Sequence, residues 1–198
     1  MPSDVRPNLN LLKADLSNEI DCIRLKDAIL KVHGQLDHVV TSIGGWRTDG
    51  PLSNLTVSEY QKALQEMTLP HFVVYRTFAN LLNERPNSTS TFVTGGSCDA
   101  ARFDPKASML PPSAGLGYGL YTAAVSEHAR SKNLKVIQLR PYFWVRRDHG
   151  SKFDPKKAQM EVGTDYVAKF VPKIIFRNKP EVYKLTTRAV ADQLFTTL

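Results

Sequence analysis

A turn of small residues after an aliphatic segment is the part of the sequence best suited to hold a ligand. Residues 36–41 contain two adjacent valines and run into Ser42, Ile43, Gly44 and Gly45. Adjacent valines suit a strand that is buried on both faces. Nucleotide-binding α/β folds open a crevice at the carboxyl ends of such strands, where a glycine-bearing turn lets the backbone approach the ligand. The pattern therefore indicates a crevice of that type.

The titratable side chains give no sign of a metal centre. The chain contains five histidines and two cysteines, Cys22 and Cys98. They lack the close spacing of zinc ligands, and no histidine lies beside a candidate nucleophile. We interpret the histidines as surface or packing residues and the cysteines as reduced thiols, and we expect no metal.

The composition is that of an ordinary globular domain. The chain has 198 residues, of which 42% are hydrophobic and 23% charged, so we expect residues 1–198 to form one domain. No run of about 18 apolar residues exists to span a bilayer. The first ten residues are too polar for the apolar centre of a secretory signal. We therefore expect a cytoplasmic protein without membrane contact.

The formal charge of +7 could attract phosphate groups. The basic residues are scattered, with one concentration between Arg140 and Lys157, and no aromatic-interleaved nucleic-acid motif accompanies it. Residues 142–159 are expected to form a long basic loop, which is typical of a lid, a binding segment or a solvated surface. Nucleic acid is not expected as a partner.

The hydrophobic pattern predicts strands that alternate with helices. Short aliphatic or β-branched segments indicate strands, and apolar residues three or four apart indicate helices. We expect strands at residues 10–14, 36–41, 90–94, 134–139 and 181–185, and helices at about 18–33, 57–82, 113–131, 161–176 and the C-terminus. This order implies right-handed crossovers and a parallel sheet covered by helices on both faces.

Local signals set the ends of the expected helices. Ser17 is a candidate cap for the first helix, and Gly34 suits its end. Thr56 and Glu59 form a capping box at the start of the second, which Pro70 should kink or break. The prolines within residues 98–112 predict a loop there.

The ends of four expected strands should form one rim, because ligands bind at the carboxyl edge of a parallel sheet. That edge would bring together Asp15, residues 42–45, residues 95–97 and residues 141–143.

The order of these segments resembles the short-chain dehydrogenase/reductase family over nearly the whole chain. Asp15 and Leu16 look like the family's adenine-contacting position, and residues 41–44 look like the strand and turn beside the cofactor. Residues 91–97 match the strand that ends at the catalytic serine, and residues 134–141 match the strand that ends in Pro-Gly. The resemblance implies a Rossmann-like fold, an NAD or NADP cofactor and a small carbonyl or alcohol substrate.

The same resemblance implies seven cofactor-binding residues. They are Asp15, Leu16, Ser42, Ile43, Gly44, Gly45 and Pro141.

The phosphate-binding part of that family's site has no counterpart in the sequence. The family's first strand, its T-G-x-x-x-G-x-G turn and the following helix are missing, so we expect a fold without the first βαβ unit and weak or absent binding of NAD(P). The glycines at 115, 117 and 119 do not follow a strand. A packing role for them is favoured over a phosphate loop.

The family's catalytic groups are also altered. The Tyr-x-x-x-Lys pair should fall near Leu110 or Pro111 and Gly115, and the family's helix asparagine near Met67. In that pair the lysine lowers the tyrosine pKa for proton transfer. None of these positions carries the expected residue.

Two residues remain as catalytic candidates, Ser97 and Tyr118. Tyr118 has Thr122 four residues on, and Tyr121 has Val125, so neither has a lysine on its helix face. Both tyrosines could instead be packing residues, and Ser97 a turn residue.

Three interpretations are therefore open. The chain is a divergent oxidoreductase with impaired catalysis, or a non-catalytic module that responds to nucleotides or binds protein, or a truncated gene product. Without the first βαβ unit, either the strand at 36–41 pairs with the one at 10–14, or an open edge is left and the domain is marginally stable, a homo-oligomer such as a dimer, or prone to aggregate.

Overall fold

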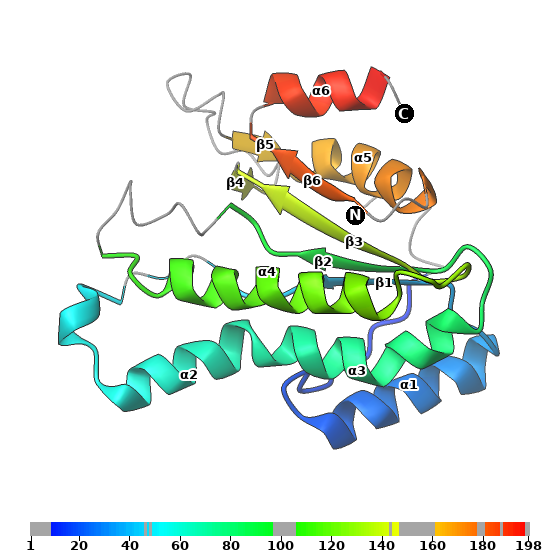
Figure 1. Cartoon of the computed structure of the whole chain (residues 1–198), viewed down its shortest axis with the longest axis horizontal. Helices are drawn as coiled ribbons and strands as arrows, with labels where there is room; N and C mark the ends of the chain where they lie inside the picture. The colour runs from blue at the N-terminus through cyan, green and yellow to red at the C-terminus, as the bar shows by residue number, and fades with distance from the viewer. Residues whose placement is uncertain are drawn as a thin grey trace.

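A four-stranded parallel sheet forms the centre of the molecule (Figure 1). The computed structural model describes residues 9–45, 47, 49–96, 106–142, 144–146, 161–177, 181–186 and 188–196. The strands are β1 (His38–Ser42), β2 (Thr89–Val93), β3 (Lys135–Pro141) and β6 (Val182–Leu185), in the order β1-β2-β3-β6.

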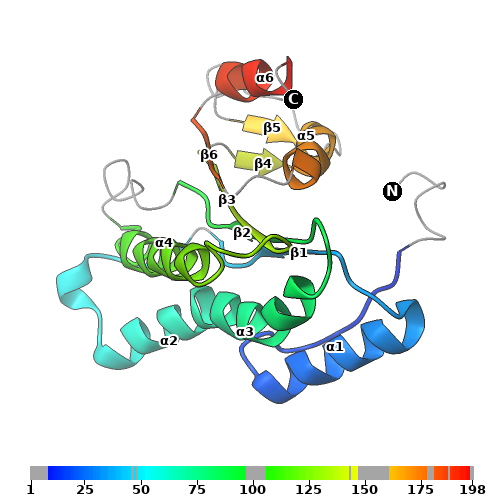
Figure 2. The ribbon, with the colours of Figure 1, turned by 45° about the vertical axis from the view of Figure 1, so that its right-hand side comes forward.

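Helices cover both faces of this sheet (Figures 1 and 2). On one side lie α1 (Glu19–His33), α2 (Val57–Met67), α3 (Leu69–Asn83) and α4 (Leu110–Glu127), and on the other lie α5 (Thr164–Arg177) and α6 (Arg188–Thr196). A short 3-10 helix, η2 (Leu52–Asn54), precedes α2. The predicted Rossmann-like class is confirmed. Among these helices none is both long and apolar enough to cross a bilayer.

Each face of the sheet has its own hydrophobic core. Between the sheet and α3 and α4, the fully buried side chains of Phe92 and Leu82 pack with Tyr121 and Val136. On the other face, Ile137 and Ile174 belong to a second cluster that α5 and β6 share. Alternating residues of β3 therefore enter different cores, as expected for a strand covered on both sides.

Most of the expected helix ends are confirmed. Thr56 and Glu59 make the reciprocal hydrogen bonds of a capping box, and Gly34 ends α1 with φ 72°. The helical segment breaks at Thr68, two residues before Pro70, which gives the separate helices α2 and α3. The cap of α1 is Asn18 rather than Ser17: the Asn18 side chain accepts from two backbone N–H groups, whereas Ser17 donates to Asp15.

The strand expected at residues 10–14 is absent from the structure. Leu11 is 84% exposed, and residues 9–14 have no regular structure. Among the strands of the described residues, β1 pairs only with β2, on one side. The apolar composition of residues 10–14 predicted a strand wrongly, because among the described residues no neighbouring strand lies alongside to satisfy its backbone.

The loops predicted at residues 142–159 and 98–112 are also wrong in part. Within residues 142–159, β4 (Trp144–Arg146) pairs in parallel with β5 (Glu161–Gly163), and residues 143 and 147–159 lie outside the described part. α5 begins after β5, at Thr164 rather than 161. Within residues 98–112, α4 begins at Leu110, because Pro111 lies in its first turn, where a missing N–H costs nothing.

Candidate functional site

The carboxyl ends of β1, β2 and β3 form one aligned rim. Ser42 pairs with Val93, and Val93 pairs with Leu139, so the three strands end at nearly the same level. The Gly96 N–H donates to the Pro141 carbonyl at 2.9 Å. The structure therefore brings residues 42–45, 95–96 and 141 to one edge, as the sequence predicts.

Asp15 and Leu16 reach the same edge beside β1. They line a cavity of about 620 Å³ together with Ile43, Lys62 and Glu66. The Asp15 carboxylate accepts hydrogen bonds from the Ser17 hydroxyl at 2.7 Å and the Ser17 N–H at 2.9 Å. These bonds lower the pKa of Asp15, so the cavity has an anionic acceptor at its wall. Such a group can bind the hydroxyl or amino groups of a polar ligand.

The turn after β1 is exposed to solvent on its outer side, and on its inner side it lies close to the Met67 side chain. Ser42, Gly44 and Gly45 are exposed. Gly44 has φ 99°, and a Cβ there would lie 3.6 Å from Met67 Cε. Glycine is therefore required at this position by backbone conformation, which is strained for a residue with a side chain.

Tyr118 lies against the end of β2, where its hydroxyl is engaged by the backbone. The hydroxyl donates to the Gly95 carbonyl at 2.9 Å. Above the ring, the guanidinium carbon of Arg140 lies 3.5 Å from the ring centroid, within the range of a cation–π contact. Ser97, the other catalytic candidate, lies outside the described residues.

Arg140 and Gln138 form a polar network that was not predicted from the sequence. Two guanidinium nitrogens of Arg140 donate to Gln138 Oε1 at 3.0 and 2.6 Å, and Gln138 Nε2 donates to Thr94 Oγ1 at 3.0 Å. The network links the ends of β2 and β3 beneath Tyr118. A signal was available: polar residues alternate with apolar ones at the end of an otherwise aliphatic strand.

The positions where the family resemblance places the tyrosine and the asparagine do meet in space, as apolar side chains. Leu110 is 1% exposed and packs with Ala107 and Met67 in one small cluster. Gly115, at the expected lysine position, has no neighbouring heavy atom within 4 Å of a built Cβ. These side chains contain no group that transfers a proton.

The remaining glycines and Tyr121 have packing roles. Gly115, Gly117 and Gly119 lie inside α4, and a Cβ on Gly117 would lie 3.4 Å from Thr94 Cγ2. Gly117 thus permits close contact of α4 with β2, whereas a phosphate loop precedes a helix. Tyr121 is buried in the core, and burial raises the pKa of its hydroxyl.

The described residues hold no group of three or more histidine, cysteine, aspartate or glutamate side chains that could bind a metal.

Comparison with known proteins identifies the fold. No family model matches the chain, and no curated protein matches it in sequence. ElxO with NADP bound is similar, with a TM-score of 0.77, 16% identity and coverage of 92% of this chain and 79% of that chain. NADPH-bound carbonyl reductase from chicken fatty liver has a TM-score of 0.73, 13% identity and coverage of 91% and 76%.

A third similar structure aligns over a smaller share of both chains. Sorbitol-6-phosphate 2-dehydrogenase SrlD from Erwinia amylovora has a TM-score of 0.58, 19% identity and coverage of 65% of this chain. This chain spans about half of that protein, 49% of its length. Together the similar structures confirm the short-chain dehydrogenase/reductase fold that the sequence resembles.

Proposed function

We propose that this chain has the fold of a nicotinamide-dependent oxidoreductase but does not transfer hydride to or from carbonyl or alcohol substrates, and that it binds NAD(H) and NADP(H) weakly or not at all. The observation that supports this proposal is the packing of Leu110 with Met67 and Ala107. Reduction of a carbonyl requires a proton donor within hydrogen-bond reach of the oxygen. Leucine and methionine at those positions supply none.

Tyr118 does not compensate for the missing donor. It lies two turns of α4 beyond Leu110, and its hydroxyl donates to the Gly95 carbonyl. Its charged neighbour, Arg140, lies over the ring face, with its Nε and Nη2 directed to Gln138. This arrangement favours a structural role for the pair, joining α4 to the ends of β2 and β3.

Phosphate binding is also disfavoured at the helix start beside the rim cavity. A helix N-terminus attracts anions through its free N–H groups. In α1 the first turn contains Glu19 and Asp21, and Asn18 already accepts from the N–H groups of Ile20 and Asp21. The acidic side chains repel a pyrophosphate, so the Asp15 cavity is better suited to a nucleoside than to a whole dinucleotide.

Titration calorimetry with NADH and NADPH, together with turnover assays on a panel of carbonyl substrates, tests the proposal. We expect dissociation constants of about 1 mM or weaker and no cofactor oxidation. Tyr118→Phe is the matched variant, and it should leave both measurements unchanged. A dissociation constant in the micromolar range or tighter, or turnover that Tyr118→Phe abolishes, contradicts the proposal.

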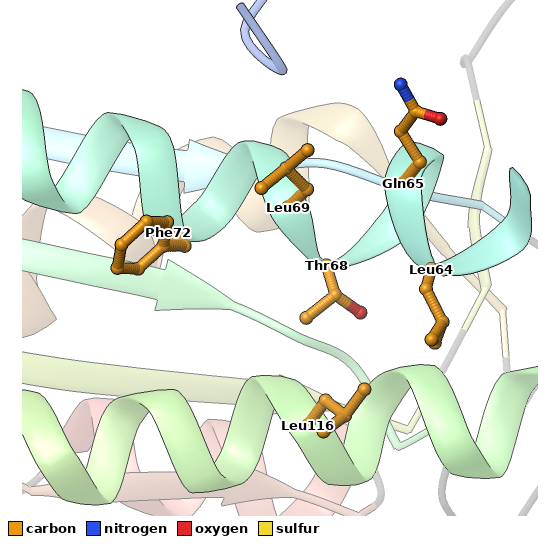
Figure 3. Close-up of a pocket in the computed structure, with 6 residues that line it drawn as sticks. All are labelled: Leu64, Gln65, Thr68, Leu69, Phe72 and Leu116. Carbon is orange, nitrogen blue, oxygen red and sulfur yellow. The ribbon is translucent and has the colours of Figure 1, made fainter. Parts of the chain in front are cut away.

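A second candidate function is protein interaction. It is favoured by an apolar groove between α4 and the helices α2 and α3 (Figure 3). Leu64 and Phe72 face Leu116 of α4 across a cavity of about 450 Å³. Phe72 is 46% and Leu116 48% exposed. Adjacent exposed apolar side chains of this size mark interaction surfaces, and a second copy of the chain is the partner we propose.

Sedimentation velocity over a concentration series tests this second function. We expect the wild type to self-associate, and Leu116→Asp to shift the equilibrium toward monomer, because a carboxylate in the groove would lose its hydration. Ile20→Asp on α1, which is also exposed but outside the groove, is the control and should not change the equilibrium. A wild type that stays monomeric throughout contradicts self-association.

A further inference from the structure

A small internal cavity lies directly beneath the turn after β1. It is lined by residues from both sheet and helices: Ile43, Met67, His71, Thr94, Ser113, Ala114 and Gly117. Its volume is about 20 Å³. A cavity needs roughly 10–15 Å³ of such volume to hold one water molecule, so this one accommodates a single hydroxyl-sized group.

His71 is one of the buried polar side chains that the described residues leave incompletely bonded. It is 3% exposed, and its ring hydrogen-bonds the backbone of Ile43. Its Nδ1 atom is buried and has no hydrogen-bond partner among the residues that the structure describes. Since Nδ1 has no partner, we assign the interaction with the Ile43 backbone to Nε2.

The bonding pattern determines what Nδ1 requires. A ring that donates through Nε2–H to a carbonyl and is otherwise neutral has an acceptor lone pair on Nδ1. Burial lowers the pKa of His71, while the bond to Ile43 opposes that change. Neutral imidazole is thus the favoured form, and its Nδ1 needs a hydrogen-bond donor.

We propose that this cavity binds one O–H group, which donates a hydrogen bond to His71 Nδ1 and connects α3 to α4 and β2. A buried acceptor without a partner is destabilising, and the O–H group would offset that cost.

The cavity wall supplies further polar partners for the same group. The Ser113 hydroxyl donates to the Met109 carbonyl at 2.8 Å, so its lone pairs remain able to accept. Thr94 also lines the cavity, and its Oγ1 accepts from Gln138 at 3.0 Å. A buried water needs two to four polar partners, and His71 and Ser113 can supply two.

Two sources can supply this O–H group: a water molecule or the hydroxyl of a small alcohol. The site does not depend on nicotinamide binding, because its lining includes Ile43 but not Asp15 or Leu16. Failure of the proposed function would therefore leave this inference intact, and the reverse also holds.

Crystal structures of the wild-type protein, grown in aqueous buffer and then soaked in methanol, test the proposal. Density for a single atom within hydrogen-bond distance of Nδ1 in aqueous crystals supports a water. Density that appears only after the methanol soak, or extends by one carbon, supports an alcohol hydroxyl. Absence of density at Nδ1 in both conditions overturns the proposal.

Two substitutions of His71 test the acceptor atom Nδ1 and the donor group Nε2–H separately. His71→Asn keeps an acceptor near the Nδ1 position but cannot reach Ile43, whereas His71→Gln keeps a donor that reaches Ile43 and lacks that acceptor. The bound group should persist in His71→Asn and disappear in His71→Gln. The opposite pattern contradicts the role of Nδ1.

Long-range nitrogen–proton NMR of the wild-type ring provides a readout in solution. We expect the Nε2–H tautomer, with the Nδ1 resonance shifted from its free value toward that of a hydrogen-bonded acceptor. A resonance of an Nδ1–H tautomer, or of an unbonded Nδ1, would overturn the proposal even if both variants failed to fold.

Discussion

β2 and β1 are neighbours in the same sheet, yet they are held in different ways. β2 pairs on both sides, and its residues Thr89 to Phe92 are all buried. In the described part of the chain β1 pairs on one side only, and Val40, in its middle, is 42% exposed. The centre of the sheet is therefore stabilised by burial, whereas the edge formed by β1 depends on fewer contacts.

Side-chain hydrogen bonds compensate for part of this difference. The Thr41 hydroxyl donates to the Thr91 carbonyl at 3.2 Å, and His38 Nδ1 lies 3.0 Å from Thr89 Oγ1. Both bonds connect β1 to β2, in addition to the backbone ladder. The turn after β1 is also contacted by His71, whose ring interacts with the Ile43 backbone. The rim is thus positioned by specific polar contacts and the core by apolar area.

The largest expected effect is that of Phe92→Ala in β2. Truncating a fully buried phenylalanine removes apolar contact and leaves a cavity, so the free energy of unfolding should fall by about 3–5 kcal/mol. Val40→Ala in β1 should cost less than about 1 kcal/mol. Urea denaturation measures both. If the two variants lost the same free energy of unfolding, β1 would have to be as buried in solution as β2. The difference in burial between the two strands would then be contradicted.

Thr41→Val should have an intermediate effect. The substitution keeps the side-chain shape but removes the hydroxyl bonded to Thr91, which should reduce stability by about 0.5–1.5 kcal/mol. Thr122→Val, at an exposed position on α4, is the control and should cost about 0.5 kcal/mol or less. If the two variants are equally stable, the polar contact contributes nothing to holding β1.

Acidification should weaken the attachment of the rim through His71. Because its pKa in the folded state is below the ordinary 6.5, the unfolded chain takes up the proton first as the pH falls. Stability is therefore complete above about pH 6.5 and decreases as the pH falls toward the folded-state pKa. Urea midpoints between about pH 7 and pH 5 measure this decrease, which should be smaller in His71→Gln.

The exposed His33 offers a control for that experiment. His33→Gln should retain the wild-type pH dependence. A His71→Gln variant with the same decrease as the wild type would show that other groups cause it.

The smallest effect is expected at the start of β1, where Arg85 pairs with Asp37 at 3.2 Å. Both side chains are substantially exposed, so Asp37→Asn should cost about 0.2–1 kcal/mol. The cost should decrease further in high salt, because screening weakens exposed pairs. Urea denaturation at two salt concentrations measures it, and a loss above about 2 kcal/mol would place this pair among the main supports of β1.

The sequence predicts the sheet well because its strands and caps are local signals. The aliphatic segments gave β1, β2, β3 and β6 within about two residues of their observed ends. The prediction of a strand at residues 10–14 was wrong for a reason that is not local. A strand forms only where a neighbouring strand can hydrogen-bond its backbone. The pair of β4 and β5 was missed for a similar reason, since its pairing joins segments that are distant in sequence.

The candidate site was predictable as a place but not as a set of interactions. The rule that ligands bind at strand ends located Ile43, Gly95 and Pro141 correctly at one edge. It could not show that Arg140 lies over Tyr118, or that His71 reaches Ile43, because these contacts depend on how α3 and α4 are rotated against the sheet.

The close approach of Gly96 to Tyr142 has a consequence for reading mutational data. A Cβ at Gly96 would lie 2.4 Å from the Tyr142 ring, so any larger residue requires the Tyr142 ring to move or the ends of β2 and β3 to separate. In a scan of all substitutions, position 96 would appear intolerant, next to a strand end where catalysis is expected in this fold. Its intolerance would report a spacing requirement, and a reader who inferred an active site from it would be misled.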